Sequence, residues 1–160
     1  MILNVNLNHD LKEYTDYSIK NKVDELVVIN KYNMLGDFNA NLNYCMGYYV
    51  FSIEMCNNFK AFLEEISDVN ISYEVIESFE KRDLFDEHAT GLAINIQYDY
   101  NYNNLVEEIA SRHGFVLRYK NEYFNVCGYE EEGHFRYVGD VSVELYNLQV
   151  SLEEYIYLKQ

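Results

Sequence analysis

The chain has 160 residues and a formal net charge of −15, and this acidity excludes polyanionic partners. Nucleic acids and anionic membrane surfaces are bound by neutralising phosphates with Lys and Arg, of which the chain has only 12. With 49% hydrophobic residues, it is long and apolar enough to fold as one domain over residues 1–160 with its own core. The acidic side chains keep this Tyr-rich domain in solution.

The three cysteines, Cys45, Cys56 and Cys127, are predicted to be buried small apolar residues. They form no CxxC pair, and an odd count does not indicate a disulfide framework. The N-terminal segment carries charges at Asp10 and Lys12 and has no sustained apolar stretch. We therefore expect neither a signal peptide nor a membrane anchor, and a cytoplasmic location.

The first half of the chain contains a predicted helix between predicted strands. The β-branched run at 26–30 and the segment 71–76 are typical of strands. Between them, apolar residues recur at helical spacing over residues 52–67, which predicts an amphipathic helix. In residues 92–98 apolar and polar residues alternate, so this strand should point Asn95 away from its aliphatic face.

The second half continues the mixture of helices and strands. Asn103 or Asn104 can cap a helix that Gly114 ends. Two further strands are predicted over residues 115–119 and 134–138.

The C-terminal segment is predicted to contain helices with N-caps at Asp140 and Ser151, and Ser151 with Glu154 makes a capping box. Helices and strands follow one another without a regular βαβ alternation. The fold class predicted from this order is α+β, with an antiparallel sheet.

Two histidines and a carboxylate stand out as candidates for chemistry. His88 and His134 lie in separate segments, and Glu131 stands three residues before His134. A catalytic zinc needs three protein ligands, an open position for water and a nearby carboxylate to accept the proton of that water. By themselves, two histidines in a globular domain are more often satisfied polar residues than metal ligands.

The strings around these residues resemble a known family. HATGLAIN (88–95) and GYEEEGHFRYVG (128–139) are similar to the S-x-H-x-x-G-x-A-x-D and E-x-x-H motifs of the VanY-like zinc D,D-carboxypeptidases. HGFVLRY, SLEEYIYL and LVVINKYNMLG (26–36) also resemble family segments, so the likeness covers most of residues 26–158. It implies a small antiparallel sheet flanked by helices, a zinc cofactor, and a peptidoglycan precursor or stem peptide ending in D-Ala-D-Ala as partner.

The resemblance assigns roles residue by residue. His88 and His134 take the positions of the two histidine ligands, and Glu131 takes that of the general base. Asn95 occupies the position of the aspartate ligand. Because an amide is neutral, this exchange should weaken zinc binding. The loss of a residue that only hydrogen-bonds to a ligand lowers metal affinity by about 10–100-fold, and the loss of the charged ligand itself should lower it at least as much.

The substrate-gripping arginine of the family is also exchanged. Residues 77–80 align best with its serine–glycine–tyrosine–arginine stretch, which puts Glu80 in the arginine position. At about 4 Å a glutamate repels a substrate carboxylate by up to ~4 kcal/mol at an effective dielectric near 20. If this alignment is shifted by one or two residues, Lys81 or Arg82 supplies the cation instead. The loop that leads to His88 is also shorter than is usual in the family.

Asp86 stands two residues before the first histidine, where the family has a serine. Residues i and i+2 of an extended segment face the same way, so Asp86 is a candidate to supply the carboxylate that Asn95 lacks. Alternatively, it belongs to the solvated acidic run 83–87. A further exchange places Gly133 where the family has a bulky residue.

Three functions follow from these patterns. The chain is a relative that has lost catalysis and keeps its cleft for binding, or an active zinc peptidase whose ligands are His88, His134 and either Asp86 or Asn95. A purely structural role through the acidic, Tyr-rich surface is the third. Whether the chain is an enzyme stays open at this point.

Overall fold

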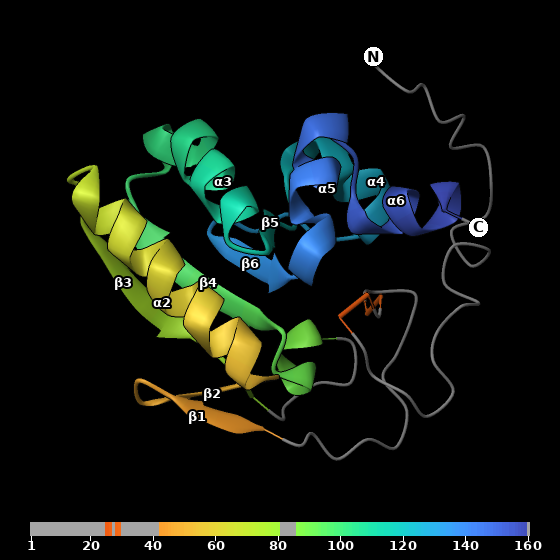
Figure 1. Cartoon of the computed structure of the whole chain (residues 1–160). Helices are drawn as coiled ribbons and strands as arrows, with labels where there is room; N and C mark the ends of the chain where they lie inside the picture. Colours follow the sequence, from red (N-terminus) through yellow and green to blue (C-terminus); the bar gives the residue numbers. More distant parts are fainter. Residues whose placement is uncertain (1–24, 27, 30–41, 81–85, 160) are drawn as a thin grey trace.

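The computed structural model describes residues 25–26, 28–29, 42–80 and 86–159 (Figure 1). Within these ranges the strands form two antiparallel sheets: the hairpin β1 (Asn43–Cys45) and β2 (Tyr48–Val50), and a four-stranded sheet of order β3-β4-β6-β5. The larger sheet consists of β3 (Tyr73–Glu77), β4 (Ala93–Tyr98), β5 (Phe115–Leu117) and β6 (His134–Tyr137). Helices flank it, so the predicted α+β class with a small antiparallel sheet is confirmed.

The helices occupy most of the rest of the described chain. They are α2 (Ile53–Asp68), α3 (Asn103–Arg112), α4 (Phe124–Cys127), α5 (Ser142–Leu148) and α6 (Leu152–Leu158). Short 3-10 turns connect them: η1 (Glu87–Thr90), η2 (Tyr100–Tyr102), η3 (Asn121–Tyr123) and η4 (Gly139–Val141). Figure 1 shows α3 between α2 and α5, and it contacts both. Among these described helices, none has the length and apolar character that crossing a membrane requires.

Helix α2 covers one face of the larger sheet. Ser52 caps it by accepting a backbone N–H from the first turn. Its inward side chains repeat at helical spacing, and the ring of Phe62 stacks on Phe115 at 5.5 Å and meets Phe135 edge-on at 5.2 Å. The helix predicted over residues 52–67 is confirmed, and it anchors the core against β5 and β6.

The register of the larger sheet gathers polar residues on its other face. Asn95 on β4 lies opposite Glu77 on β3 and opposite His134 on β6. Because side chains of a strand alternate between faces, Ile94 and Ile96 enter the core while Asn95 points away from it. The predicted orientation of Asn95 is confirmed, and three strands thereby place three polar side chains in a row.

Two of the predicted N-caps are wrong. Helix α3 begins at Asn103 with no side-chain cap, and Asp140 lies inside η4, ahead of an α5 that begins at Ser142. In both cases a 3-10 turn leads directly into the helix and its carbonyl accepts the first helical N–H, so no capping side chain is needed. Ser151 does cap α6, with Glu154 completing the predicted capping box.

The strand predicted over residues 26–30 is absent from the described part of that segment. Leu26 lies in a turn, and Val28 and Ile29 belong to no strand, while residues 27 and 30 lie outside the described ranges. Val28 and Ile29 are nevertheless buried. The apolar run therefore indicated burial and not strand pairing. The other four predicted strands are present at β3, β4, β5 and β6.

All three cysteines are buried, as predicted, but the expectation of no disulfide is wrong for two of them. Cys45 and Cys56 form a disulfide between β1 and the first turns of α2, across a sequence separation of 11. The tight hairpin turn after Cys45 brings β1 over the helix, which the spacing of the cysteines alone does not reveal. Cys127 is free and fully buried, as predicted.

Removing this disulfide should lower stability measurably. For a closed loop of this length we expect Cys45→Ser with Cys56→Ser to reduce the free energy of unfolding by about 2–3 kcal/mol, measured by urea denaturation. A reductant should destabilise the wild type by a similar amount and leave the double variant unchanged. A reductant effect of equal size on both proteins contradicts the assignment.

Candidate functional site

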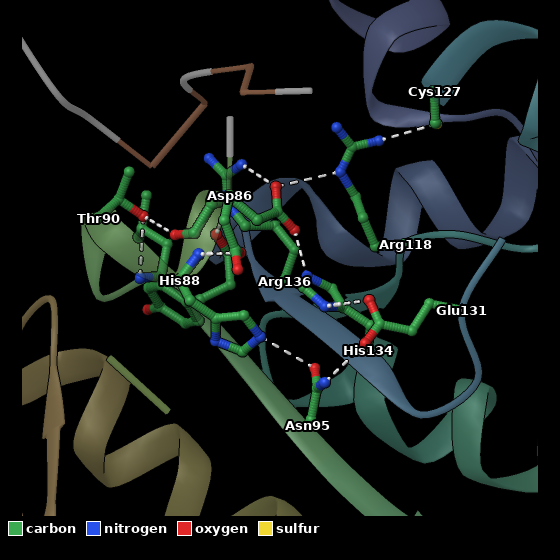
Figure 2. Close-up of polar contacts among 12 residues, drawn as sticks. Asp86, His88, Thr90, Asn95, Arg118, Cys127, Glu131, His134 and Arg136 are labelled. Atoms are coloured by element: carbon green, nitrogen blue, oxygen red, sulfur yellow. Dashed lines mark hydrogen bonds and ion pairs between the residues drawn. The ribbon is translucent and has the colours of Figure 1, made fainter. Parts of the chain in front are cut away.

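His88 is held by the short turn η1. Asp86 caps this turn, because its Oδ1 accepts the backbone N–H of His88 at 2.9 Å. The turn closes when the Thr90 hydroxyl donates to the carbonyl of Glu87 at 2.6 Å, and Gly91 ends it in the left-handed region. The imidazole of His88 is only 2% exposed and its Nε2 lies 3.1 Å from Oδ1 of Asn95 (Figure 2).

Two glycines of the motifs are required by close backbone approach. A Cβ on Gly91 would lie 2.6 Å from the side chain of Leu42, and its φ of +79° disfavours any L side chain. At Gly133, with φ of +68°, a Cβ would lie 2.1 Å from the carbonyl oxygen of Ile96. The exchange at Gly133 noted from the sequence is therefore explained by the chain passing directly against β4.

The amide of Asn95 joins the histidine to the candidate base. Its Nδ2 donates to Oε1 of Glu131 at 2.9 Å and more weakly to Oε2 of Glu77 at 3.4 Å. The carboxylate of Glu131 can only accept, so the amide nitrogen must face it and the amide oxygen must face His88. His88 consequently donates its Nε2–H to Asn95, which occupies the lone-pair position that a metal would need.

His134 lies between two carboxylates. Its Nε2 is 2.7 Å from Oε1 of Glu87, and its Nδ1 is 3.2 Å from Oε2 of Glu131 without the alignment of a hydrogen bond. Its ring contacts that of His88 at 4.8 Å. Burial lowers the pKa of His134, but Glu131 and Glu87 outweigh it and raise this pKa to about 9. The imidazole is therefore a cation at neutral pH.

Glu131 is the ionised partner of that cation. The close contact with the imidazole of His134 is the main cause that lowers the pKa of Glu131, against the effect of its partial burial, and the amide of Asn95 adds to it. Both carboxylate oxygens are thus engaged within the protein.

A buried ion cluster below the histidines was missed from the sequence. Glu87 is fully buried and accepts from Nε of Arg118 at 3.2 Å and from Nη1 of Arg136 at 2.9 Å. Arg118 also grips Glu153 through two bonds of 2.6 Å. Burial raises the pKa of Glu87, but the two guanidinium groups outweigh it and hold this pKa far below its usual value. Two arginines within otherwise apolar strand segments were the signal for this cluster.

The structure brings together four of the predicted site residues: His88, Asn95, Glu131 and His134. Asp86 instead caps η1, because one of its carboxylate oxygens accepts the backbone N–H of His88. The backbone N–H of Glu80 donates to the carbonyl of His88 at 3.4 Å, which runs this segment beside the site. Arg82, the other substrate-binding candidate, lies outside the described residues.

The donor set, as arranged, does not fit zinc. Among the described residues, no three His, Cys, Asp or Glu side chains converge as a metal-binding group. Asn95 supplies a neutral amide where a carboxylate is needed, His88 uses Nε2 as a donor to it, and His134 is cationic. Zinc ligands must be deprotonated or neutral with a free lone pair, and Nε2 of His88 and the cationic ring of His134 do not present one to a metal in this arrangement.

Comparisons with known proteins agree on the architecture. No protein-family model and no curated protein matches the sequence. In structure, the chain is similar to VanYB in complex with D-alanine-D-alanine (TM-score 0.76, 18% identity, covering 85% of this chain and 99% of that chain). The chain has the VanY-like peptidase fold. The family resemblance predicted from the sequence is confirmed at this level.

Two further solved structures share the VanY-like fold. A variant of the vancomycin resistance D,D-pentapeptidase VanY in complex with Zn(II) has a TM-score of 0.74 at 18% identity, covering 82% of this chain and 98% of that chain. The LdcB LD-carboxypeptidase has a TM-score of 0.77 at 18% identity, covering 88% and 89%. Identities this low establish the fold, and the chemistry has to be argued from the site.

The raised pKa of His134 makes stability depend on pH. Its folded pKa of about 9 exceeds the ordinary histidine pKa of 6.5, so the folded state holds more protons between these values. This contribution is complete below pH 6.5 and is lost as the pH rises through 9, with a slope of at most about 1.4 kcal/mol per pH unit. Urea denaturation at several pH values should show the decline in the wild type and a flatter profile in His134→Gln. Parallel profiles would contradict the assignment.

Removing the charge of Glu87 should destabilise the folded protein. Glu87→Gln leaves Arg136 and Arg118 partly unpaired in the interior, and we expect a loss of about 3–5 kcal/mol in the free energy of unfolding. Glu130→Gln on the surface is the control and should change stability by less than about 0.5 kcal/mol. Similar losses for both variants would show that the buried cluster is not a special determinant of stability.

Proposed function

We propose that the chain is a divergent VanY-like protein that binds peptidoglycan stem peptides without hydrolysing them, and that its site works without zinc. The observation that carries this proposal is the amide of Asn95, which bridges His88 and Glu131. The remaining support comes from the charges around it and from the ligands named for the structural neighbours.

Asn95 removes the electrostatic need for a metal. An aspartate here would bring a third carboxylate beside Glu131 and Glu77, at distances where like charges strongly repel without a cation. The amide instead presents N–H donors to both carboxylates. His134 supplies the positive charge that pairs with Glu131. The negative charge of Glu131 is therefore paired without a metal.

Glu131 is poorly suited to act as a general base in this arrangement. A general base works best when its pKa lies near the working pH, whereas the contacts of Glu131 with His134 and Asn95 lower its pKa below the ordinary value. A water molecule would have to compete with these two partners for its oxygens. Retention of Glu131 is therefore compatible with a role in holding the network together.

The ligand class is supported by the neighbours that share the fold. VanYB is described in complex with D-alanine-D-alanine, and LdcB in connection with peptidoglycan recognition. The backbone contact between Glu80 and His88 keeps the segment that carries the substrate-binding position in the family alongside the site. We extend the ligand class, but not the hydrolysis, to this chain.

The sequence predicted a cytoplasmic location, and the disulfide favours a different compartment. Cys45 and Cys56 are paired and buried, and such bridges persist in oxidising environments. We therefore propose that binding takes place outside the reducing cytoplasm, where assembled peptidoglycan is found.

Metal analysis together with an Asn95→Asp variant tests the proposal. Wild-type protein purified without chelators should contain far less than one equivalent of zinc, bind a D-Ala-ended pentapeptide in calorimetry, and release no D-Ala. Asn95→Asp should raise zinc affinity by at least about 10–100-fold and lower the stability of the metal-free protein. Asn57→Asp, an exposed exchange on α2, is the matched control and should do neither.

The alternative function is an active zinc peptidase with an altered ligand set. Its supporting observation is that the ring of His134 contacts that of His88 at 4.8 Å, while its Nδ1 lies 3.2 Å from Oε2 of Glu131. Stoichiometric zinc in the wild type, with D-Ala release that Glu131→Gln abolishes, would establish this alternative and overturn the proposal of binding without hydrolysis.

A further inference from the structure

We propose that the disulfide between Cys45 and Cys56 is a redox switch, which fixes the turn that carries His88 and makes the site bind its ligand well only in the oxidised protein. The inference rests on the proposed function and deepens it, because it names what regulates the same site. The disulfide joins β1 to the first turns of α2. From there a series of contacts through the β1–β2 hairpin leads to η1.

The hairpin relies on attachments to the rest of the protein. Within the described residues, β1 and β2 pair only with each other and form a sheet separate from the four-stranded one (Figure 1). A two-stranded hairpin is at best marginally stable by itself. Its inner face packs on the core, where Val50 is fully buried and the ring of Tyr48 meets that of Phe59 on α2 at 6.1 Å. Reduction of the disulfide leaves the hairpin with this packing and without its covalent attachment to α2.

The ends of the hairpin are joined to η1. The backbone N–H of Phe51, directly after β2, donates to the carbonyl of Gly91 at 3.0 Å. Leu42, directly before β1, lies so close to Gly91 that a Cβ there would be 2.6 Å from its side chain. The backbone N–H of Gly91 in turn donates to the carbonyl of His88 at 3.1 Å. Two backbone hydrogen bonds and one close contact therefore connect the hairpin to His88.

The turn η1 is held at both ends, and only one end depends on the disulfide. At its start, Glu87 is fixed by the buried arginines. At its end, Gly91 is fixed by the hairpin. His88 lies between them, and its Nε2 is 3.1 Å from Oδ1 of Asn95. When the hairpin loosens, we expect the Gly91 end to be released while the Glu87 end stays in place, so that the contact between His88 and Asn95 is no longer fixed.

The switch closes by thiol–disulfide exchange with a disulfide-bearing oxidant. One cysteine thiolate attacks a sulfur of the oxidant, and the second cysteine displaces the reduced oxidant from the mixed disulfide. Two electrons and two protons thereby pass from Cys45 and Cys56 to the oxidant, whose S–S bond breaks as that of the protein forms. The closed bond is shielded, because Cys45 is 1% and Cys56 7% exposed. It therefore persists in an oxidising compartment, whereas the protein in a reducing compartment keeps both thiols.

Amide hydrogen exchange tests the switch without any ligand. With a dithiol reductant, the amides of Phe51 and Gly91 should exchange at least about tenfold faster, because their hydrogen bonds open when the hairpin loosens. The amide of Ile96 in β4, which donates to the carbonyl of Gly133 at 2.9 Å, is the internal control and should keep its rate. In Cys45→Ser with Cys56→Ser, the reductant should change none of these rates.

Calorimetric titration with the D-Ala-ended pentapeptide tests the effect on the site. Reduced wild type and the double serine variant should bind it at least about tenfold more weakly than oxidised wild type. Val106→Ala, which removes methyl groups from the buried side of α3, is the control for general destabilisation. It should lower the midpoint of urea denaturation and leave the affinity unchanged.

The inference is overturned if the reductant leaves the exchange rates of Phe51 and Gly91 unchanged. It is also overturned if Ile96 accelerates to the same extent, since the disulfide would then be a determinant of the whole fold. Equal affinity of oxidised wild type and the double serine variant refutes the switch and leaves stem-peptide binding intact. Failure of the oxidised protein to bind the pentapeptide refutes the proposed function instead, and the exchange rates then decide whether the disulfide fixes the turn.

Discussion

The site depends on one buried ion cluster, in which the carboxylate of Glu87 is held between Arg118, Arg136 and the imidazole of His134. Charges are tolerated in a protein interior only when they are paired and hydrogen-bonded, and here two carboxylates, Glu87 and Glu153, face two guanidinium groups. Because Glu87 immediately precedes His88, the same anchor fixes the backbone of η1 and the ring of His134. The ion cluster around Glu87 therefore orients both histidines, and this orientation does not depend on a bound ligand or metal.

Because the ion cluster orients the histidines, the residues at positions 95 and 131 can interact differently without a change in the fold. In a zinc site the metal is the largest local charge and determines which ligands are ionised. In this chain the amide of Asn95 and the cationic His134 take over the pairing of Glu131. The amide of Asn95 donates to Glu131 and Glu77, which an aspartate at this position would repel. The histidines take part in this arrangement, because their rings contact each other and His88 contacts Asn95.

The sequence predicted the fold and the gathering of the site well, because both follow from local patterns. Alternation along 92–98 placed Asn95, and helical spacing placed α2. What failed depended on contacts distant in the chain: the disulfide requires the hairpin to fold over α2, and the ion cluster requires Arg118, Arg136 and Glu153 to meet Glu87. Asp86 looked like a candidate ligand from its spacing, yet a local backbone N–H engages its carboxylate first.

The exchange at Glu80 limits how the site can hold a ligand. Taken alone, a glutamate in place of a substrate-gripping arginine indicates loss of function, because it repels a terminal carboxylate. The backbone N–H of Glu80 donates to the carbonyl of His88 at 3.4 Å, so an acidic residue lies beside the candidate site. Specificity is a difference of affinities and is often achieved by repelling the wrong ligand. Under the proposed function, the affinity for a D-Ala-ended peptide therefore has to come from contacts other than a cation at position 80.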